Sequence, residues 1–341
     1  MNRSETWWFS QAVRIFGNGC AFAAALTATA MVIGKGLPFP TIPDVSPKFR
    51  YFAEHKDRFD TIFVGSSRFR HQIIPQKFDA ETRDHGTETS SFNLGASGMW
   101  PPETFFFLRQ ILRLHPARLK WVIFEIIDGK TRVDEGYASQ QRAVYWHDWR
   151  HTLMAWKMVW ESSRTPEEKR HLISLHTGIF FRQFFHLGRG TEWAQEKMNF
   201  VKKHRVPSWI EARGFEPEPE PSLLVGRVLA EYLSVIDELK KPRLPRGIRP
   251  GLIDALREIQ AEVRGAGAEA LFVLPPTINP HENFGGLPGG LPFILFNNLH
   301  DDALLYEPEL HYDGGHLNAR GAEAFTRRLG ERFSEWRRQG R

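Results

Sequence analysis

The sequence predicts an α/β fold: a parallel sheet covered by helices, interrupted by a helical insertion and preceded by a membrane helix. Three observations lead to this prediction. Short apolar strand-like runs alternate with helical spacing in residues 58–130 and again in 251–338, strand signals are scarce between them, and a long uncharged stretch lies near the amino terminus. Such alternation is typical of a parallel sheet with helices on its faces. With 341 residues, 41% of them hydrophobic, the chain can bury a large core.

The uncharged stretch comprises residues 15–34 and lies between Arg14 and Lys35. At about 1.5 Å per residue, a helix of this length covers the roughly 30 Å of a hydrocarbon core. We therefore expect residues 1–36 to be an uncleaved membrane anchor. The alternatives are a signal peptide cleaved near Ala28–Ala30 and a buried core helix. With either an anchor or a signal peptide, the rest of the chain lies outside the cytoplasm.

The first half of the expected α/β domain has strand–helix–strand order. Two short apolar strands are predicted at Thr61–Val64 and Ser91–Leu94. Helical spacing follows over residues 105–114, and residues 121–127 form an apolar run that only Glu125 interrupts. This order is that of a βαβ unit.

The same pattern returns near the carboxyl terminus. Residues 252–263 have the spacing of an amphipathic helix, and residues 270–274 form a strand that ends at two prolines. The last helix is predicted to start at Asn318, a good N-cap residue, and it carries apolar residues along one face.

The region between these halves has a different composition. Tryptophans 149, 156 and 160 and Leu153 form a stripe at helical spacing, which favours a core or inter-domain contact over a sugar-binding platform or a membrane-lying face. Proline-rich residues 216–221 and 241–245 are typical of stiff spacers. The expected organisation is an anchor or signal segment (1–36), a first α/β part (37–135), a helical insertion (136–250) and a second α/β part (251–341).

Two local patterns together contain the parts of a hydrolytic triad. Ser66 and Ser67 follow the first strand, and the carboxyl edge of a parallel sheet is where such folds bind ligands. Asp313 and His316 lie three residues apart before the last helix, where the carboxylate can reach the imidazole Nδ1. A serine needs such a base, and the base needs such a carboxylate. The non-catalytic alternative is that all of them cap or orient helices.

These motifs resemble the conserved blocks of the SGNH (GDSL-like) hydrolase superfamily. Gly65–Ser67 is similar to its Gly-Asp-Ser block, Asn93–Gly98 to its glycine block, and Asp313–Asn318 to its closing Asp-x-x-His block. The resemblance covers residues 58–130 and 251–338. It implies a three-layer, flavodoxin-like domain.

The resemblance also implies a role for each residue at the site. Ser67 takes the nucleophile's position, His316 that of the base and Asp313 that of its carboxylate. The amides of Ser67 and Gly98 take the positions of oxyanion donors. The family's Gly-x-Asn-Asp block is not kept, because residues 124–129 read Phe-Glu-Ile-Ile-Asp-Gly and supply no asparagine donor. Loss of one such donor commonly lowers the rate about a hundredfold or more.

The Gly-Ser-Ser block, the anchor and the missing asparagine together resemble a divergent, membrane-anchored branch of the superfamily. This branch includes D-alanyl transfer proteins of teichoic acid and partners of polysaccharide O-acetyltransferases. The resemblance implies acyl transfer to, or ester hydrolysis on, an envelope or secreted polysaccharide, at the periplasmic or extracytoplasmic side of a bacterial cytoplasmic membrane. The implied partners are an acylated glycan and a membrane-bound acyltransferase. The alternatives are a catalytically silent glycan-binding or assembly subunit and a phosphodiester or lipid hydrolase.

Three further polar residues are candidate substrate contacts. Arg68 and His71 follow the serine closely and are suited to an anionic or polyol substrate, although exposed polar residues are also common on a first helical turn. Asp128 either faces the site or ends its strand.

Other functional classes find little support. The histidines at 281, 300 and 311 lack the spacing of metal ligands, so neither a metal nor another cofactor is expected. The net charge of +5 is scattered, which argues against nucleic acid and favours anionic surfaces such as lipid or acidic glycan. The single cysteine, Cys20, excludes an intramolecular disulfide.

Overall fold

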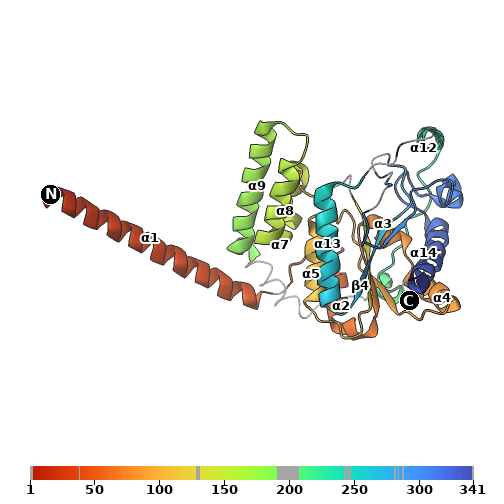
Figure 1. Cartoon of the computed structure of the whole chain (residues 1–341), viewed down its shortest axis with the longest axis horizontal. Coiled ribbons are helices and arrows are strands. Elements are labelled where there is room, and N and C mark those ends of the chain that lie inside the picture. Colours follow the sequence, from red (N-terminus) through yellow and green to blue (C-terminus); the bar gives the residue numbers. More distant parts are fainter. Residues whose placement is uncertain are drawn as a thin grey trace. The chain divides into compact units, whose positions relative to one another are not determined.

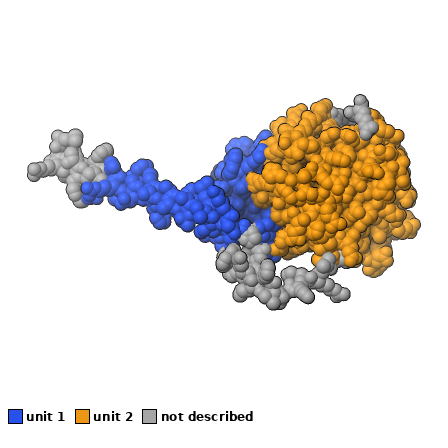
Figure 2. All heavy atoms as spheres, turned by 90° about the horizontal axis from the view of Figure 1, so that it is seen from below, with its two compact units in different colours: residues 1–41, 135–203 blue, residues 42–134, 204–341 orange. Residues whose placement is uncertain are grey.

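The computed structural model describes residues 3–37, 39–127, 131–189, 207–241, 244, 247–279, 282, 284–285 and 288–339. The chain forms two compact units, coloured separately in Figure 2. The first comprises Met1–Thr41 and Glu135–Lys203, and the second comprises Ile42–Asp134 and His204–Arg341. Residues 204–250, which the sequence predicts as part of the insertion, therefore fall in the same unit as the sheet.

A five-stranded parallel sheet with the order β2-β1-β3-β4-β5 forms the centre of the second unit. Its strands are β1 (Thr61–Val64), β2 (Ser91–Asn93), β3 (Trp121–Glu125), β4 (Glu269–Leu274) and β5 (Phe293–Leu295). The predicted α/β class with a parallel sheet is confirmed. The sequence did not predict β5, because three residues among glycines and prolines are too few to show a strand pattern.

Helices lie on both faces of this sheet (Figure 1). One face carries α2 (Ser46–His55), α5 (Glu103–Leu112) and α13 (Pro250–Gly265), and the other carries α3 (Ser67–Gln72), α4 (Pro75–Asp84) and α14 (Ala319–Gln339). Side chains alternate accordingly. Phe124 stacks on Phe105 of α5 with ring centroids 5.6 Å apart, whereas Phe63 meets Phe78 of α4 edge to face at 5.0 Å.

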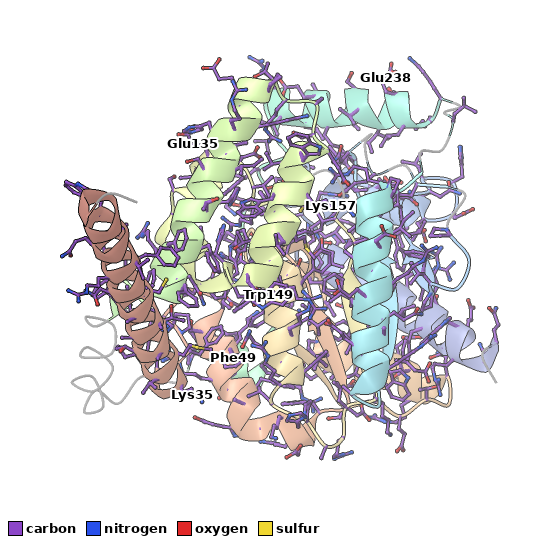
Figure 3. All side chains as sticks on the ribbon, turned by 60° about the vertical axis from the view of Figure 1, so that its left-hand side comes forward. Lys35, Phe49, Glu135, Trp149, Lys157 and Glu238 are labelled. Carbon is purple, nitrogen blue, oxygen red and sulfur yellow. The ribbon has the colours of Figure 1, made fainter. Side chains whose placement is uncertain are left out.

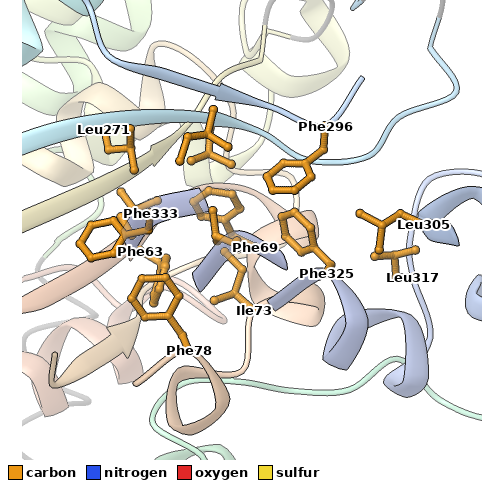
Figure 4. Packing of buried hydrophobic residues seen from close by; sticks show 14 of the residues in the cluster. Phe63, Phe69, Ile73, Phe78, Leu271, Phe296, Leu305, Leu317, Phe325 and Phe333 are labelled. Atoms are coloured by element: carbon orange, nitrogen blue, oxygen red, sulfur yellow. The ribbon is translucent and has the colours of Figure 1, made fainter. Parts of the chain in front are cut away.

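The core under α3 and α14 is rich in phenylalanine (Figure 4). Phe69 of α3 and Phe325 of α14 are both fully buried in the same cluster as Phe63, Phe78 and Phe333. Burying each ring stabilises the fold by roughly 2–3 kcal/mol. This packing holds α3 and the start of α14 on one face of the sheet.

Shorter elements complete the second unit. They are η1 (Lys56–Arg58), α11 (Ser208–Glu211), α12 (Gly226–Leu239), η4 (Ala303–Tyr306) and η5 (Pro308–Leu310). Tyr232 of α12 donates a hydrogen bond to the carbonyl of Tyr306 at 2.7 Å, which ties α12 to the chain that precedes α14.

The first unit is helical in its described residues. It contains α1 (Arg3–Gly36), α6 (Glu135–Ala138), α7 (Gln141–Trp146), α8 (Trp149–Trp160) and α9 (Pro166–Phe184). Residues 11–36 of α1 are long and apolar enough to cross a membrane, and only 6% of the most apolar window is buried.

The prediction that the tryptophan stripe on α8 is core fails at both ends of the stripe, whereas Trp156 between them is half-buried, and an inter-domain contact stays a prediction. Trp149 and Trp160 are 67% and 69% exposed. The buried face of α8 consists instead of His151, Thr152, Ala155 and Val159. Polar residues recur on this buried face, and apolar periodicity alone therefore pointed to the wrong side of the helix.

Candidate active site

The turn from β1 into α3 is tight and has no space for a side chain at Gly65. A Cβ atom there would lie 2.5 Å from Oε2 of Glu125 and 2.8 Å from the Phe69 ring. Ser66 then caps α3, because its hydroxyl oxygen accepts a hydrogen bond from the Arg68 amide at 3.3 Å. This turn brings Ser67 to the carboxyl edge of the sheet.

Ser66 points into the protein. Its amide donates to Glu125 Oε2 at 2.5 Å, its hydroxyl donates to Glu125 Oε1 at 3.0 Å, and the residue is only 2% exposed. Glu125 is the last residue of β3, and its side chain is fully buried. Ser66 therefore satisfies a buried carboxylate, which removes it from contact with a substrate.

Ser67 points to His316, and His316 points to Asp313. The Ser67 Oγ lies 2.8 Å from His316 Nε2, and His316 Nδ1 lies 3.0 Å from Asp313 Oδ1. The tautomer that satisfies both contacts carries its proton on Nδ1 and leaves Nε2 free to accept the serine proton. The structure thus brings together the three residues for which the sequence predicts a triad.

Asp313 is held in the charged form needed to orient the imidazole. Its Oδ1 also accepts hydrogen bonds from the amides of Gly315 at 2.7 Å and His316 at 2.8 Å. Burial opposes ionisation, but the hydrogen bonds and the charge of the imidazole outweigh it and hold the pKa of Asp313 below its usual value.

The loop that carries this pair is fixed at the start of α14. The Asn318 side chain accepts a hydrogen bond from the Gly321 amide at 3.0 Å, as predicted for an N-cap residue. The Asn318 amide donates to the Leu310 carbonyl at 2.9 Å. A Cβ at Gly321 would lie 2.1 Å from that same carbonyl oxygen, so only glycine allows this approach.

The predicted oxyanion donors lie on two neighbouring turns. The Ala96 amide donates to the Gly65 carbonyl at 3.1 Å, and Arg70 Nη1 donates to Ser97 Oγ at 2.8 Å, which holds the loop after β2 beside α3. Within the part of the chain that the structure describes, the amides of Ser67 and Gly98 donate to no other protein group. The Ser67 amide belongs to the first helical turn, where amides lack an intrahelical acceptor.

Neither the described residues 124–127, at the position of the Gly-x-Asn-Asp block, nor the nearby Asn93 supplies the missing asparagine donor. Asn93 is fully buried, and both polar atoms of its side chain are hydrogen-bonded within the protein. Its Nδ2 donates to the carbonyls of Phe69 and Ile73, and its Oδ1 accepts from the Gly95 amide. Asp128, the third candidate substrate contact, lies outside the described residues.

Arg68 is part of a buried ion network. Its Nε lies 2.7 Å from Glu125 Oε1 and its Nη1 lies 2.8 Å from Glu282 Oε2, with the side chain 12% exposed. Burial alone would lower the pKa of Arg68, but the charges of Glu282 and Glu125 raise it above its usual value. These contacts direct the guanidinium toward the protein, so it supports the turn that carries Ser67.

His71 lies beside the triad. Its ring centroid is 6.2 Å from that of His316, and its Nδ1 donates to the Glu216 carbonyl at 2.7 Å. Burial lowers the pKa of His71 to about 4, which keeps the ring neutral near pH 7. The Nε2 atom of His71 lies 3.7 Å from Glu218 Oε1.

Glu218 is a site residue that the sequence reasoning missed. Its Oε1 lies 4.0 Å from His316 Nδ1, and burial raises its pKa, as does the nearby charge of Asp313. The Glu-Pro composition around it predicts a stiff spacer, whereas the structure packs residues 216–218 against α3 and the His316 loop.

This Glu-Pro segment is anchored by close backbone contacts. The Asn93 amide donates to the Arg213 carbonyl at 2.9 Å, and a Cβ at Gly214 would lie 2.0 Å from the Asn93 carbonyl oxygen. The buried Lys48 Nζ donates to the carbonyls of Gly95 at 2.7 Å and Gly214 at 2.6 Å. Burial lowers the pKa of Lys48 to about 7.

Comparison with known proteins adds no assignment. No protein-family model matches the chain, and no curated protein is significantly similar to it in sequence. Among the described residues, no three histidine, cysteine, aspartate or glutamate side chains are grouped so that they could hold a metal ion.

Proposed function

We propose that this protein is a serine-dependent enzyme that transfers or removes acyl groups, most simply acetyl groups, on a cell-envelope or secreted polysaccharide. The observation that carries the proposal is the continuous chain of contacts from Ser67 Oγ to His316 Nε2 and from His316 Nδ1 to Asp313. Such a chain activates a hydroxyl that is otherwise a weak nucleophile.

The proposed reaction has two halves. Ser67 Oγ attacks the ester carbonyl while His316 Nε2 takes the serine proton, and the amides of Ser67 and Gly98 hold the developing oxyanion. His316 returns the proton to the leaving alcohol, which leaves an acyl-serine. Water or a sugar hydroxyl then attacks this ester with His316 again as base, and the acyl group leaves with the new acceptor.

The fold supports this proposal. The strand order β2-β1-β3-β4-β5 is that of flavodoxin-like sheets, in which ligands bind at the carboxyl ends of the strands. Ser67 follows β1, beside the point where the order reverses. This topology, together with the Gly-Ser-Ser and Asp-x-x-His motifs, favours a divergent SGNH-like domain.

The polysaccharide substrate rests on the resemblance and on α1. A candidate membrane helix that precedes a hydrolase-like domain in the sequence suits an enzyme that is held near an envelope polymer. A membrane-bound acyltransferase is the partner that would supply acyl groups across the bilayer.

One observation favours a second candidate, a glycan-binding subunit without catalytic activity. The described site offers only two backbone donors for an oxyanion, and no asparagine replaces the third. A triad with this donor set turns over more slowly than a complete one by about a hundredfold or more.

A fluorophosphonate probe distinguishes the two candidates. We expect labelling of the wild type and of Ser66→Ala, and no labelling of Ser67→Ala. A folded wild-type protein that resists the probe would favour the binding subunit. Acetylated glycan and phospholipid vesicles, offered separately, test the substrate class, because cleavage of the lipid alone would reject the polysaccharide assignment.

A further inference from the structure

The helical unit carries exposed apolar side chains at one end. Trp149, at the start of α8, is 67% exposed, Phe181, near the end of α9, is 49% exposed, and Leu187, just beyond α9, is 58% exposed. A five-residue connection joins α8 to α9, so the two helices are antiparallel and these three residues share one end of the hairpin. We call this set the apolar tip. Figure 3 labels Trp149 at its end of α8.

The apolar tip is adjacent to the candidate membrane helix. His186 lies between Phe181 and Leu187, and its Nε2 donates to the Ala30 carbonyl at 3.1 Å. A Cβ at Gly34 would lie 2.5 Å from the same Nε2, so the imidazole also approaches α1 closely at this position. Two separate positions of α1 therefore touch the chain just after α9.

The contact follows one stripe of α1. Thr27, Ala30 and Gly34 are the less exposed positions of α1 over this stretch, followed by Leu37 just beyond its end, whereas the residues between them are exposed. Their spacing of three, four and three residues is that of one helix face. Most residues of this face are small, which permits the close approach of His186.

The depth of this contact in a bilayer follows from the positions of the charged residues on α1. Lys35 is the first charged residue after the apolar stretch, and Ala30 lies five positions before it, about 7 Å deeper along a helix. His186 therefore meets α1 where the hydrocarbon core ends and the headgroup region begins.

We propose that the apolar tip is a second membrane-binding element, which inserts its aromatic side chains into the outer boundary of the bilayer beside α1. Aromatic side chains concentrate at this depth in membrane proteins. Arg182 and Arg189 flank the tip and suit anionic headgroups, because long cationic side chains reach back to the interface. The opposite end of the hairpin has one exposed tryptophan, Trp160, whose ring lies under the Lys169 ammonium group at 6.0 Å, and it carries the charged run Glu167–Arg170, which belongs in water. The lipid bilayer is thus the occupant that the tip fits, because His186, which lies between two residues of the tip, contacts α1 within its exposed apolar stretch.

The inference goes beyond the proposed reaction and requires only that α1 spans a bilayer.

The protein has a single cysteine, Cys20, in the middle of the apolar stretch. The test uses full-length protein in vesicles of phosphatidylcholine and phosphatidylglycerol. In the wild type, a nitroxide is attached to Cys20. In three further variants Cys20→Ser removes that site, and the nitroxide is attached to the cysteine introduced by Phe181→Cys, Leu187→Cys or Glu167→Cys. Collisions with oxygen, which enriches in lipid, are compared with collisions with a water-soluble nickel chelate.

We expect Cys20, position 181 and position 187 to favour oxygen, and position 167 to favour the nickel chelate at least several-fold. Nickel accessibility at 181 and 187 equal to that at 167 would overturn the inference, provided that Cys20 still reports lipid. Exclusion of both reagents from 181 and 187 would also overturn it, because protein would then cover the tip. Nickel access at Cys20 itself would reject the anchor and the inference with it, and would leave the serine chemistry unaffected.

Discussion

Ser66 and Ser67 are neighbours in the chain, yet their hydroxyl groups face different partners. The Ser66 hydroxyl donates to the buried carboxylate of Glu125 at 3.0 Å, and the Ser67 hydroxyl lies 2.8 Å from His316 Nε2. Ser66 thus stabilises the turn, and the turn places Ser67 beside the imidazole. Substitutions at the two positions should have opposite effects on stability and on reactivity.

Ser66→Ala should destabilise the protein and preserve its reactivity. Loss of a hydroxyl that donates to a buried carboxylate costs about 1–3 kcal/mol in the free energy of unfolding. Thermal unfolding in detergent checks this expectation, with Ser67→Ala as the control that changes stability by no more than about 0.5 kcal/mol. A stable Ser66→Ala protein that no longer reacts with fluorophosphonate would identify Ser66 as the nucleophile instead.

Asp313→Asn should lower kcat on nitrophenyl acetate by about 10³–10⁴-fold, because an asparagine no longer fixes the proton on His316 Nδ1. The melting temperature should change little, since the side chain is one-third exposed. Asp301→Asn, on an exposed turn in the same unit, serves as the matched control. Equal activity in the two variants would remove Asp313 from the mechanism.

Glu218→Gln should move the acidic limb of the kcat/KM profile to lower pH. When charged, this carboxylate lies 4.0 Å from His316 Nδ1 and favours the imidazolium. Removing a unit charge at that distance weakens the interaction by about 1 kcal/mol at water-like screening, which corresponds to roughly 0.7 pH unit. Glu220→Gln, two residues along the same segment, provides the control. An unchanged profile for Glu218→Gln would show that this glutamate only packs beside the site.

Gly214→Ala should destabilise the protein by more than about 2 kcal/mol, because the new methyl group meets the Asn93 carbonyl oxygen and the residue has a φ of +92°. Gly226→Ala is a matched control, with a φ of +53° and nothing within 4 Å of the added Cβ. Urea unfolding of both variants separates the steric clash from the backbone strain that they share. Similar losses would show that the Glu-Pro segment relaxes away from β2 at little cost.

Lys48→Met should flatten the dependence of stability on pH. The pKa of Lys48 is about 7 in the folded protein, against 10.5 as the ordinary value. Between these values the unfolded chain binds more protons than the folded one, so stability rises with pH by up to about 1.4 kcal/mol per unit. Below about pH 7 both states are protonated, and the burial cost is fully present. Unfolding at pH 7, 8 and 9 tests this, with the exposed Lys77→Met as control, and an unchanged slope would contradict it.

The site residues that the sequence points to are those that belong to short sequence patterns. Ser67 follows a strand, Asp313 and His316 lie on one short loop before a helix, and the resemblance to the SGNH blocks singled out these three residues together. Glu218 and Glu282 reach the site only through tertiary packing of proline- and glycine-rich segments, which have no periodicity to interpret. The same limit explains the tryptophan stripe, since its exposure depends on what packs against the other face of α8.

The carboxylates around Ser67 have a consequence for the substrate. The described side chains within this network include six carboxylates and two guanidinium groups, namely Asp44, Glu125, Glu216, Glu218, Glu282, Asp313, Arg68 and Arg70. The chain as a whole carries a formal charge of +5, so its excess positive charge lies elsewhere. For the proposed reaction we therefore expect an uncharged or cationic acyl ester to react at the serine more readily than an anionic ester such as a phosphodiester.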